Sequence, residues 1–480
     1  AGMSTGSTLL VTFDGLRRDR ATADLMPNLD RFMREGSNFI NSRSVFPSET
    51  RVAVTSTMTG CPPGSHGVVA NQFIHPVRAD GLFRTAEWDD LELAAQAGQL
   101  LDRPTMGQHM AKAGRTMAVV STATKGASRM MNSSAHALGQ PVFSMHGAPV
   151  SSQDLHQQVL TRFGEIPAAE APNTARMTYA TDVLIGLVYD TYDPDFCVYW
   201  MNDPDMSSHA FGVTAAQTAQ AQKGCDDNFG RMLDWWRAGN GPENIIVMSD
   251  HGQITGQRQL ANLDIIPAEF GRASIGSFSG LYLHDTSDQN KQEVVDWLTR
   301  QDFCGLVFAT AANGAPIAGA LPWSAVRNNH ARGADIGFTL RATDCSKNYG
   351  PDIDACIFAA WISPGGGMHG GLNKGELSTV LAAQGPAYRS GFTAEAPCWL
   401  PDILPTVLTT MGLPLDGTEG RPLVEALAGA DPRFGLVPPV ETRLLHAECN
   451  GHEQYLRQWI VDGQTIVDCG WTAGTGAWSQ

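Results

Sequence analysis

Near its amino terminus the chain contains the run Leu9-Leu10-Val11-Thr12-Phe13, followed directly by Asp14-Gly15. Short apolar runs of this kind are typical of buried strands, and Asp-Gly is typical of the turn that ends a strand. Two further runs follow the same plan: residues 196–201 lead into the polar segment 202–209, and residues 245–248 lead into residues 249–252. The sequence therefore predicts three buried strands that each end on a polar group containing Asp.

Segments with helical potential lie between and beyond these strands, at residues 26–33, 215–236 and 400–411. Strands that alternate with helices favour a parallel sheet covered on both faces. We therefore expect an α/β fold with a mostly parallel central sheet flanked by helices. The ligand site of such a sheet lies beyond the carboxyl ends of its strands.

The character of the sequence changes between residues 268 and 344, where strand-like runs and a helix-like segment indicate a small α+β unit. We interpret this unit as a cap inserted into a catalytic core formed by residues 1–267 and 345–436. Residues 437–480 are expected to form a hairpin-like tail, and residues 125–156 are predicted to be irregular.

The composition is that of a globular, acidic protein. Of 480 residues, 42% are hydrophobic and 17% are charged, and the net charge is −16. This charge disfavours binding to nucleic-acid polymers, because phosphate backbones attract basic surfaces. No membrane association is expected, since no apolar run is long enough to span a bilayer. The oligomeric state is not indicated.

No signal-peptide pattern precedes Leu9. The expected location is cytoplasmic if Met3 is the native start, and periplasmic or secreted if a signal peptide has been removed. The nine cysteines include no C-x-x-C pair, which favours free thiols over disulfides. We do not expect Cys449 and Cys469 to pair.

A second informative stretch is Val45-Phe46-Pro47-Ser48-Glu49-Thr50-Arg51, which places two hydroxyl groups at the predicted start of a helix. A helix N-terminus offers unpaired backbone N–H groups and the positive end of a dipole, which suits a phosphate. Ser48 or Thr50 can simply be an N-cap. Alternatively, Thr50 is a nucleophile activated by a metal.

Candidate metal ligands follow the predicted strands. The residues of an Asp-x-x-x-His pair face the same way on a helical turn, and an Asp-His dipeptide at a strand end can direct both side chains at one ion. A histidine among glycines allows close approach of the backbone. Three carboxylates and three imidazoles form a mixed set that suits zinc or manganese. The candidates are Asp14, Asp205, His209, Asp250, His251 and His369.

Each of these clues also has an ordinary interpretation. Asp-Gly is a common turn, so Asp14 alone favours a turn. Asp-x-x-x-His pairs such as Asp205 and His209 are usually solvated, and residues 250–252 can form another turn. The shared position of the candidates after strands, in this order, favours a metal site.

Together these motifs resemble the alkaline phosphatase superfamily, and most closely its nucleotide pyrophosphatase/phosphodiesterase branch. The resemblance runs from Leu9 to about Leu427, apart from the proposed cap and residues 125–156. The motifs that carry it are residues 11–17, 46–50, 59–71, 205–209, 249–252, 369–370, 385–388, 401–406, 413–414 and 420–421.

The resemblance implies a site for two divalent ions, with zinc favoured and manganese as the alternative. Asp205, His209 and His369 would hold one ion, and Asp14, Asp250 and His251 the other, with Thr50 as its fourth ligand and as the nucleophile. Asn71 matches the position whose side-chain amide contacts a phosphoryl oxygen, and the backbone N–H of Arg51 would assist.

Chemistry supports this assignment, because a threonine hydroxyl is too weak an acid to ionise near neutral pH without a metal. Attack by Thr50 on phosphorus would give a phospho-threonine intermediate, and hydrolysis by water would give net retention at phosphorus.

The chain departs from the branch at three positions. Arg51 stands where an apolar or aromatic residue is usual, Gln253 replaces an apolar residue, and Ser208 replaces a glycine. Arg51 is either a solvated residue that pairs with Glu49 or a group that binds a substrate oxygen. In the second case a phosphomonoester, a phosphonate or a substrate with an extra carboxylate is favoured.

The leading hypothesis is a phosphodiesterase or nucleotide pyrophosphatase that acts on a small-molecule phosphate ester. The nearest alternative is a phosphomonoesterase or a phosphonate hydrolase, such as one that resembles phosphonoacetate hydrolase. A non-catalytic metal-binding relative is a more remote alternative, and nothing marks the sugar-phosphate site of a phosphomutase. A sulfatase is disfavoured, because residues 48–51 lack the Cys-x-Pro-x-Arg pattern.

Overall fold

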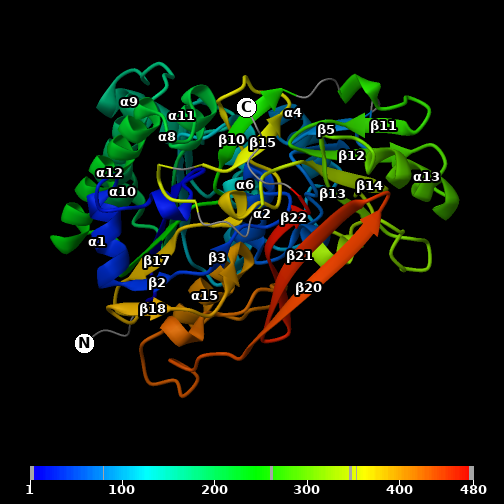
Figure 1. Ribbon diagram of the computed structural model, residues 1–480. Helices are drawn as coiled ribbons and strands as arrows, with labels where there is room; N and C mark the ends of the chain where they lie inside the picture. The colour runs from blue at the N-terminus through cyan, green and yellow to red at the C-terminus, as the bar shows by residue number, and fades with distance from the viewer. Residues whose placement is uncertain (1–4, 79–80, 260–262, 345–348, 353, 475–480) are drawn as a thin grey trace.

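An eight-stranded sheet forms the centre of the protein (Figure 1). The computed structural model describes residues 5–78, 81–259, 263–344, 349–352 and 354–474. The strand order is β18-β2-β17-β9-β1-β8-β6-β7. The bounds are β1 Thr8–Phe13, β2 Ser37–Phe39, β6 Met117–Ser121, β7 Val142–Ser144, β8 Phe196–Met201, β9 Asn244–Met248, β17 Leu381–Gln384 and β18 Phe392–Ala394.

The three strands predicted from the sequence are neighbours at the centre of this sheet. β1 pairs in parallel with β8 on one side and with β9 on the other. β6 continues the parallel arrangement, whereas β17 runs antiparallel to both β9 and β2. The predicted α/β class with a mostly parallel central sheet is therefore confirmed.

Side chains of β1 alternate between two hydrophobic layers, as the two-residue period of a strand requires. Leu9, Val11 and Phe13 pack with α1 (Pro27–Glu35), α9 (Thr174–Val183) and α12 (Ala216–Arg237). Leu10 faces the opposite layer, which contains α2 (Thr50–Thr59), α6 (Lys125–Met131) and α15 (Ile403–Thr410). Helices thus cover both faces of the sheet.

The prediction that residues 125–156 are irregular is wrong. This stretch contains α6, α7 (Ala135–Leu138), β7 and the start of α8 (Gln153–Phe163). α6 has no polar face to reveal it in the sequence, because six of its seven residues are buried. Gly126 packs so closely that an added Cβ would lie 1.8 Å from the Thr85 carbonyl oxygen.

A smaller α+β unit lies beside the central sheet. Its four strands follow the order β11-β12-β14-β13, and α13 packs on β13. A three-stranded sheet, β15-β10-β16, adjoins it. The bounds are β10 Ile254–Gln259, β11 Gly271–Ser274, β12 Phe278–Leu283, α13 Asp288–Leu298, β13 Cys304–Ala309, β14 Ile336–Leu340, β15 Cys356–Ala359 and β16 Gly367–Met368.

The carboxy-terminal segment is an antiparallel sheet of three strands, one more than the predicted hairpin. β20 (Val440–Cys449), β21 (His452–Val461) and β22 (Gln464–Thr472) form the long ribbon at the lower right of Figure 1. A buried ion pair at 2.8 Å joins Asp468 of β22 to Arg43 of the core. The ribbon is therefore fixed to the body of the protein.

The remaining elements connect these units. They are β3 Ser42–Arg43, α3 Pro63–His66, β4 Gln72–Ile74, β5 Leu82–Arg84, α4 Trp88–Gln96, α5 Met106–Lys112, α10 Tyr189–Tyr192, α11 Asp205–Phe211, α14 Lys374–Leu377 and β19 Cys398–Trp399.

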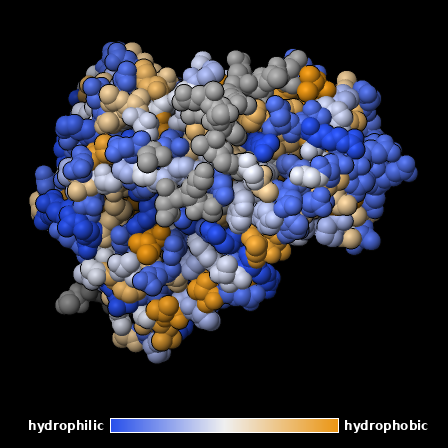
Figure 2. All heavy atoms as spheres, in the orientation of Figure 1, coloured by the Kyte–Doolittle hydropathy of each residue, from blue (hydrophilic) through white to orange (hydrophobic). Residues whose placement is uncertain are grey.

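The surface and the cysteines agree with the composition. The face shown in Figure 2 is largely hydrophilic, and its apolar residues form small separate patches. Within the described residues, no helix is both long enough and apolar enough to cross a bilayer. No disulfide joins Cys449 to Cys469 in the described part of the chain, as predicted.

Candidate active site

The predicted ligands meet at the carboxyl edge of the central sheet. Asp14 directly follows β1, Asp205 begins α11 after β8, and Asp250 and His251 follow β9. The backbone N–H of Asp205 donates to the carbonyl of Asp14 at 2.9 Å, which holds two of these strand ends together. His369 reaches the same place from the end of β16.

A glycine after Asp14 allows this close approach. Gly15 has φ +69°, and an added Cβ would lie 2.9 Å from the Cβ of Asp205. The N–H of Gly15 also donates to Asp250 Oδ1 at 3.0 Å. Asp14 therefore belongs to the predicted Asp-Gly turn and also lies beside the other candidate ligands.

Two overlapping groups of side chains have ligand atoms close enough to hold a metal ion. Asp205, His209 and His369 form the first group, and Asp14, Asp205 and His251 form the second, with all ligand atoms of a group within 4.8 Å of one another. Asp250 adjoins the second group, with its Oδ2 3.2 Å from His251 Nε2. The structure thus brings all six predicted ligands together, and places Asp205 between the two groups.

All three histidines are oriented in the same way. The Nδ1 atoms of His209, His251 and His369 lie 2.7, 2.9 and 2.7 Å from the carbonyl oxygens of Gly367, Gly252 and Ser48, respectively. A carbonyl only accepts a hydrogen bond, so each Nδ1 carries a proton and Nε2 is the nitrogen left to bind an ion. Those three Nε2 atoms face the carboxylates.

Two carboxylate oxygens of the site accept no hydrogen bond from the described residues. Asp14 Oδ1 and Asp250 Oδ2 are buried and form no hydrogen bond within the described part of the chain. Burial and the neighbouring charges of Asp250 and Asp205 raise the pKa of Asp14 well above its ordinary value. Buried carboxylate oxygens that accept no hydrogen bond destabilise the folded state, and a divalent cation bound to them would offset this loss. The donor set of carboxylates, imidazoles and one hydroxyl fits zinc or manganese.

Charges within the site also perturb the imidazoles. Burial alone would lower the pKa of His251, but Asp250 and Asp205 raise it to about 9. Burial and the proximity of His251 lower the pKa of His369 well below its ordinary value. These two rings are stacked, with centroids 3.6 Å apart.

Thr50 is the first residue of α2, and its Oγ1 lies 3.1 Å from His251 Nε2. The N-cap position is occupied by Glu49, whose side chain caps nothing. The N-cap interpretation is therefore wrong for both Ser48 and Thr50. Ser48 instead donates from its hydroxyl to the carbonyl of Gly371 and accepts from the N–H of Gly370, at 2.9 and 3.0 Å.

Arg51 and Asn71 lie beside Thr50. Asn71 Oδ1 accepts the backbone N–H of Arg51 at 3.3 Å, which leaves the Nδ2 group of Asn71 for another acceptor. Arg51 is half-buried, and its Nε donates to Thr85 Oγ1 at 3.2 Å. Among the described residues, no ion pair joins Arg51 to Glu49, contrary to the paired, solvated interpretation. Glu49 is buried and accepts the N–H of Asn71.

Three contacts of the site were not predicted. Trp200 of β8 donates its indole N–H to Asp14 Oδ2 at 2.9 Å. Gln253 donates from its side chain to Asp205 Oδ1, a contact that the apolar residue usual at this position could not make. Trp361 is 56% exposed and lies against His209, with ring centroids 5.0 Å apart. Only Gln253 was marked in the sequence; the other two contacts join separate strands and loops.

His66 lies outside the cluster of candidate metal ligands. Its Nδ1 accepts the N–H of Val68 at 3.1 Å, and its Nε2 lies 2.8 Å from Ser56 Oγ. These bonds hold His66 between α2 and the residues that follow α3.

Comparisons with known proteins agree with the motifs. A family model described as type I phosphodiesterase/nucleotide pyrophosphatase matches residues 8–301. The chain is 23% identical over 262 residues to ectonucleotide pyrophosphatase/phosphodiesterase family member 1 of Homo sapiens, covering 53% of this chain and 24% of that protein. It is 23% identical over 269 residues to the bis(5'-adenosyl)-triphosphatase enpp4 of Mus musculus, covering 53% of this chain and 49% of that protein. The chain thus spans from about a quarter to about half the length of these relatives.

A solved structure shows the same fold. An inactive form of murine ectonucleotide pyrophosphatase/phosphodiesterase 5, in complex with AMP, matches with a TM-score of 0.60 at 16% identity. The match covers 88% of this chain and 100% of the murine chain. This likeness and the family match confirm the resemblance to the alkaline phosphatase superfamily. Because the family model matches more than half of the chain, the protein belongs to the type I phosphodiesterase/nucleotide pyrophosphatase family.

Proposed function

We propose that this protein is a two-metal phosphoric ester hydrolase that acts through a phospho-threonine at Thr50. The observation that carries the proposal is the position of Thr50 Oγ1, at the start of α2 and 3.1 Å from His251 Nε2, beside both ligand groups. Asp205, His209 and His369 would hold one divalent ion, and Asp14, Asp250, His251 and Thr50 the other. Zinc is favoured and manganese is the alternative. Bound ions would supply Lewis-acid stabilisation of charge on the attacking and leaving oxygens.

Thr50 forms and loses one covalent bond in each cycle. Its Oγ attacks phosphorus, the bond from phosphorus to the leaving oxygen breaks, and the enzyme is left as a phospho-threonine. Water then attacks phosphorus from the vacated side and releases the Thr50 hydroxyl. Each displacement inverts phosphorus, so two displacements give net retention.

Residues around Thr50 position the phosphoryl group. The first backbone N–H groups of α2 point toward a group bound at Thr50, as at other helix N-termini that bind phosphate. Asn71 Nδ2 is available to a phosphoryl oxygen, since only its Oδ1 is engaged by Arg51. Trp361 offers an exposed aromatic surface beside His209, against which an aromatic leaving group would pack.

A phosphodiester or a nucleotide pyrophosphate is the favoured substrate class. The family match and the curated relatives support this choice. Arg51 supports a second candidate, a phosphomonoesterase or phosphonate hydrolase. Its half-buried guanidinium lies beside Thr50 without an ion-pair partner among the described residues, and would neutralise the extra charge of a monoester or of a carboxylated phosphonate.

A substrate panel with one pair of variants tests the proposal. Para-nitrophenyl mono-, di- and phosphonate esters, together with phosphonoacetate, would be assayed with the wild type, Thr50→Ala and Arg51→Ala. Thr50→Ala should lose turnover of every ester while it retains metal, because six ligands remain. Turnover by Thr50→Ala at the wild-type rate would refute the mechanism. A wild type that binds metal but turns over none of these compounds would favour the non-catalytic alternative.

Arg51→Ala separates the two candidates. If the substrate is a monoester or a phosphonate, this variant should lose kcat/KM on that compound and keep it on diesters. An unchanged kcat/KM on every compound would exclude a role for Arg51 in substrate binding.

A further inference from the structure

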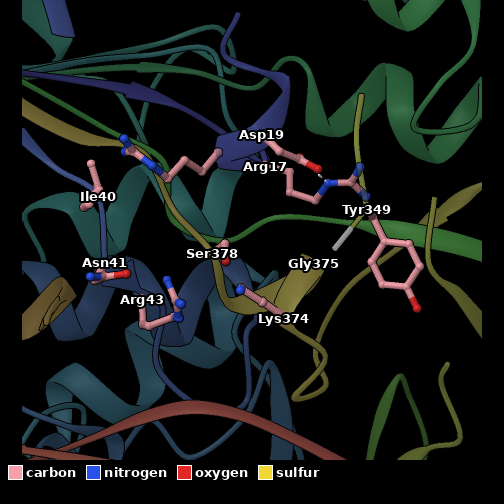
Figure 3. Close-up of a pocket in the computed structure, with 10 residues that line it drawn as sticks. Arg17, Asp19, Ile40, Asn41, Arg43, Tyr349, Lys374, Gly375 and Ser378 are labelled. Carbon is pink, nitrogen blue, oxygen red and sulfur yellow. Dashed lines mark hydrogen bonds and ion pairs between the residues drawn. The ribbon is translucent and has the colours of Figure 1, made fainter. Parts of the chain in front are cut away.

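A basic cavity lies apart from the metal-ligand cluster, between the start of the chain and α14 (Figure 3). Its volume is about 330 Å³, at the lower end of the range for small-molecule sites. Four cationic side chains and a single carboxylate line it, and neither Thr50 nor any candidate metal ligand does. The charged residues are Arg17, Arg18, Arg43, Lys374 and Asp19. Such a cavity is unexpected in a protein whose net charge is −16.

Two of these cations are already neutralised. Arg17 pairs with Asp19 at 2.6 Å and with Asp354 on another side. Arg43 pairs with Asp468 at 2.8 Å. These ion pairs explain how two arginines are tolerated in buried positions.

The other two cations have no carboxylate partner among the described residues. Arg18 donates only to neutral acceptors, the carbonyl of Phe39 at 3.2 Å and Asn38 Oδ1 at 3.0 Å. Burial and the like charge of Arg43 lower the pKa of Arg18 to about 10. Lys374 is half-buried at the start of α14 and forms no ion pair within the described ranges. The cavity thus holds an excess of positive charge.

The remaining donors surround the same space. Figure 3 shows the Lys374 amine and the Arg43 guanidinium extending toward each other, with Ser378 beside them and Asn41 on the far wall. One terminal nitrogen of the Arg17 guanidinium is buried and has no hydrogen-bond partner among the described residues, and the Arg17 side chain is only 2% exposed. Donors that have no acceptor among the described residues therefore lie on more than one wall of the cavity.

We propose that this cavity binds a small phosphate-bearing anion at a site distinct from the metal cluster. Donors that approach from several directions match the oxygens of a tetrahedral phosphate better than the planar pair of a carboxylate. A lysine that acts as a point charge is common in phosphate sites. The ligand is either inorganic phosphate or a small organic monoester, since Ile40 and Tyr349 add apolar wall to the cavity. The assignment does not depend on the proposed catalytic function.

The cavity is joined to the metal-ligand loop through Arg17. One nitrogen of Arg17 donates to the carbonyl of Gln253 at 3.1 Å, and Gln253 in turn contacts Asp205. Gly252 donates to the carbonyl of Glu376 in α14 at 2.7 Å. A ligand that contacts Arg17 and α14 would therefore bind two groups that are hydrogen-bonded to the segment that follows His251.

Metal-depleted protein isolates this site, because the other phosphate site requires the ions. Inorganic phosphate, glycerol 3-phosphate and succinate would each be titrated into chelator-treated wild type by calorimetry. Lys374→Gln and Arg18→Gln should each weaken phosphate binding about tenfold, because each removes one charge-assisted contact. Lys223→Gln, an exposed lysine of α12 paired with Asp227, is the control and should change nothing.

The dissociation constants of inorganic phosphate and glycerol 3-phosphate distinguish a free phosphate ligand from an organic monoester. The compound that binds more tightly indicates the class of ligand. Lys374 is half-buried, and its side chain forms no hydrogen bond within the described residues, so Lys374→Gln carries the test if Arg18→Gln does not fold. The proposal is overturned if chelated wild type shows no saturable binding of either phosphate, or if Lys374→Gln binds as tightly as Lys223→Gln. Tighter binding of succinate than of both phosphates would overturn the choice of anion.

Discussion

Replacing Trp200 by Phe should weaken metal binding without changing any ligand. The indole N–H of Trp200 donates to Asp14 Oδ2 at 2.9 Å, and the side chain is fully buried. Phenylalanine keeps the aromatic packing but cannot donate. Asp14 would lose the bond that fixes its carboxylate and lowers its pKa, so protons would compete more strongly with the metal.

The expected effect follows from the charge of the acceptor. A hydrogen bond to a charged group contributes about 1.5–3 kcal/mol. If Asp14 is held ready for the ion mainly by this bond, losing it weakens metal affinity by about 10- to 100-fold. Removing part of a large buried ring also leaves a cavity, which lowers the free energy of unfolding by a further ~1–3 kcal/mol whether or not metal is bound.

Trp399→Phe separates these two effects. Trp399 is as buried as Trp200, but its indole nitrogen has no hydrogen-bond partner in the described structure. Metal affinity would be measured by competition with a chelator, and unfolding by urea titration of the metal-free proteins. Both variants should lose stability, and only Trp200→Phe should lose metal affinity. A folded Trp200→Phe protein with wild-type metal affinity would refute this reasoning.

Three further predictions concern single side chains. Gln253→Leu keeps the size of the side chain but removes the donor to Asp205 Oδ1, so metal affinity should fall about tenfold in the same chelator assay. Asp468→Asn breaks a buried ion pair with Arg43 and should lower the free energy of unfolding by about 3–5 kcal/mol in urea, whereas a loss below about 1 kcal/mol would show that the pair is dispensable. Burial and nearby positive groups lower the pKa of His66 to about 3. Between about pH 3 and 6.5 the folded state therefore binds fewer protons than the unfolded state. Stability is lost as pH falls through that window. The decrease in unfolding free energy from pH 7 to pH 5 should therefore be about 2 kcal/mol smaller in His66→Gln than in the wild type, measured without metal, and equal decreases would contradict the assignment.

The centre of the fold could be predicted because its strands are buried on both faces. β1, β8 and β9 are continuous apolar runs, and each ends at a polar residue whose position in the sheet follows from the parallel arrangement. Because the carboxyl ends of parallel strands meet at one edge of a sheet, the candidate ligands that follow these strands could be predicted to lie together. His369 was the exception, because it follows a two-residue strand and was marked only by the glycines around it.

Other features could not be predicted, for a different physical reason. α6 is buried on nearly all sides, so it does not show the alternation of polar and apolar faces by which helices are recognised. The N-cap interpretation failed because the sequence does not show where α2 begins to within one residue. The contact of Trp200 with Asp14 joins neighbouring strands, and a tryptophan in an apolar run indicates only a core position.

The proposed nucleophile and the proposed metal ligands are positioned by one network, although long stretches of chain separate them. Ser48 accepts the Nδ1–H of His369 with its carbonyl and the N–H of Gly370 with its hydroxyl, two residues before Thr50. His369 itself follows β16, which pairs with β10 next to Gln253. β10 and β16 share a hydrophobic cluster with the strands of the smaller α+β unit. That unit therefore supports the loop that presents His369. Through the contact of His369 with Ser48, it also restrains Thr50. The site at the edge of the central sheet is in this way linked to residues that lie far from it in the sequence.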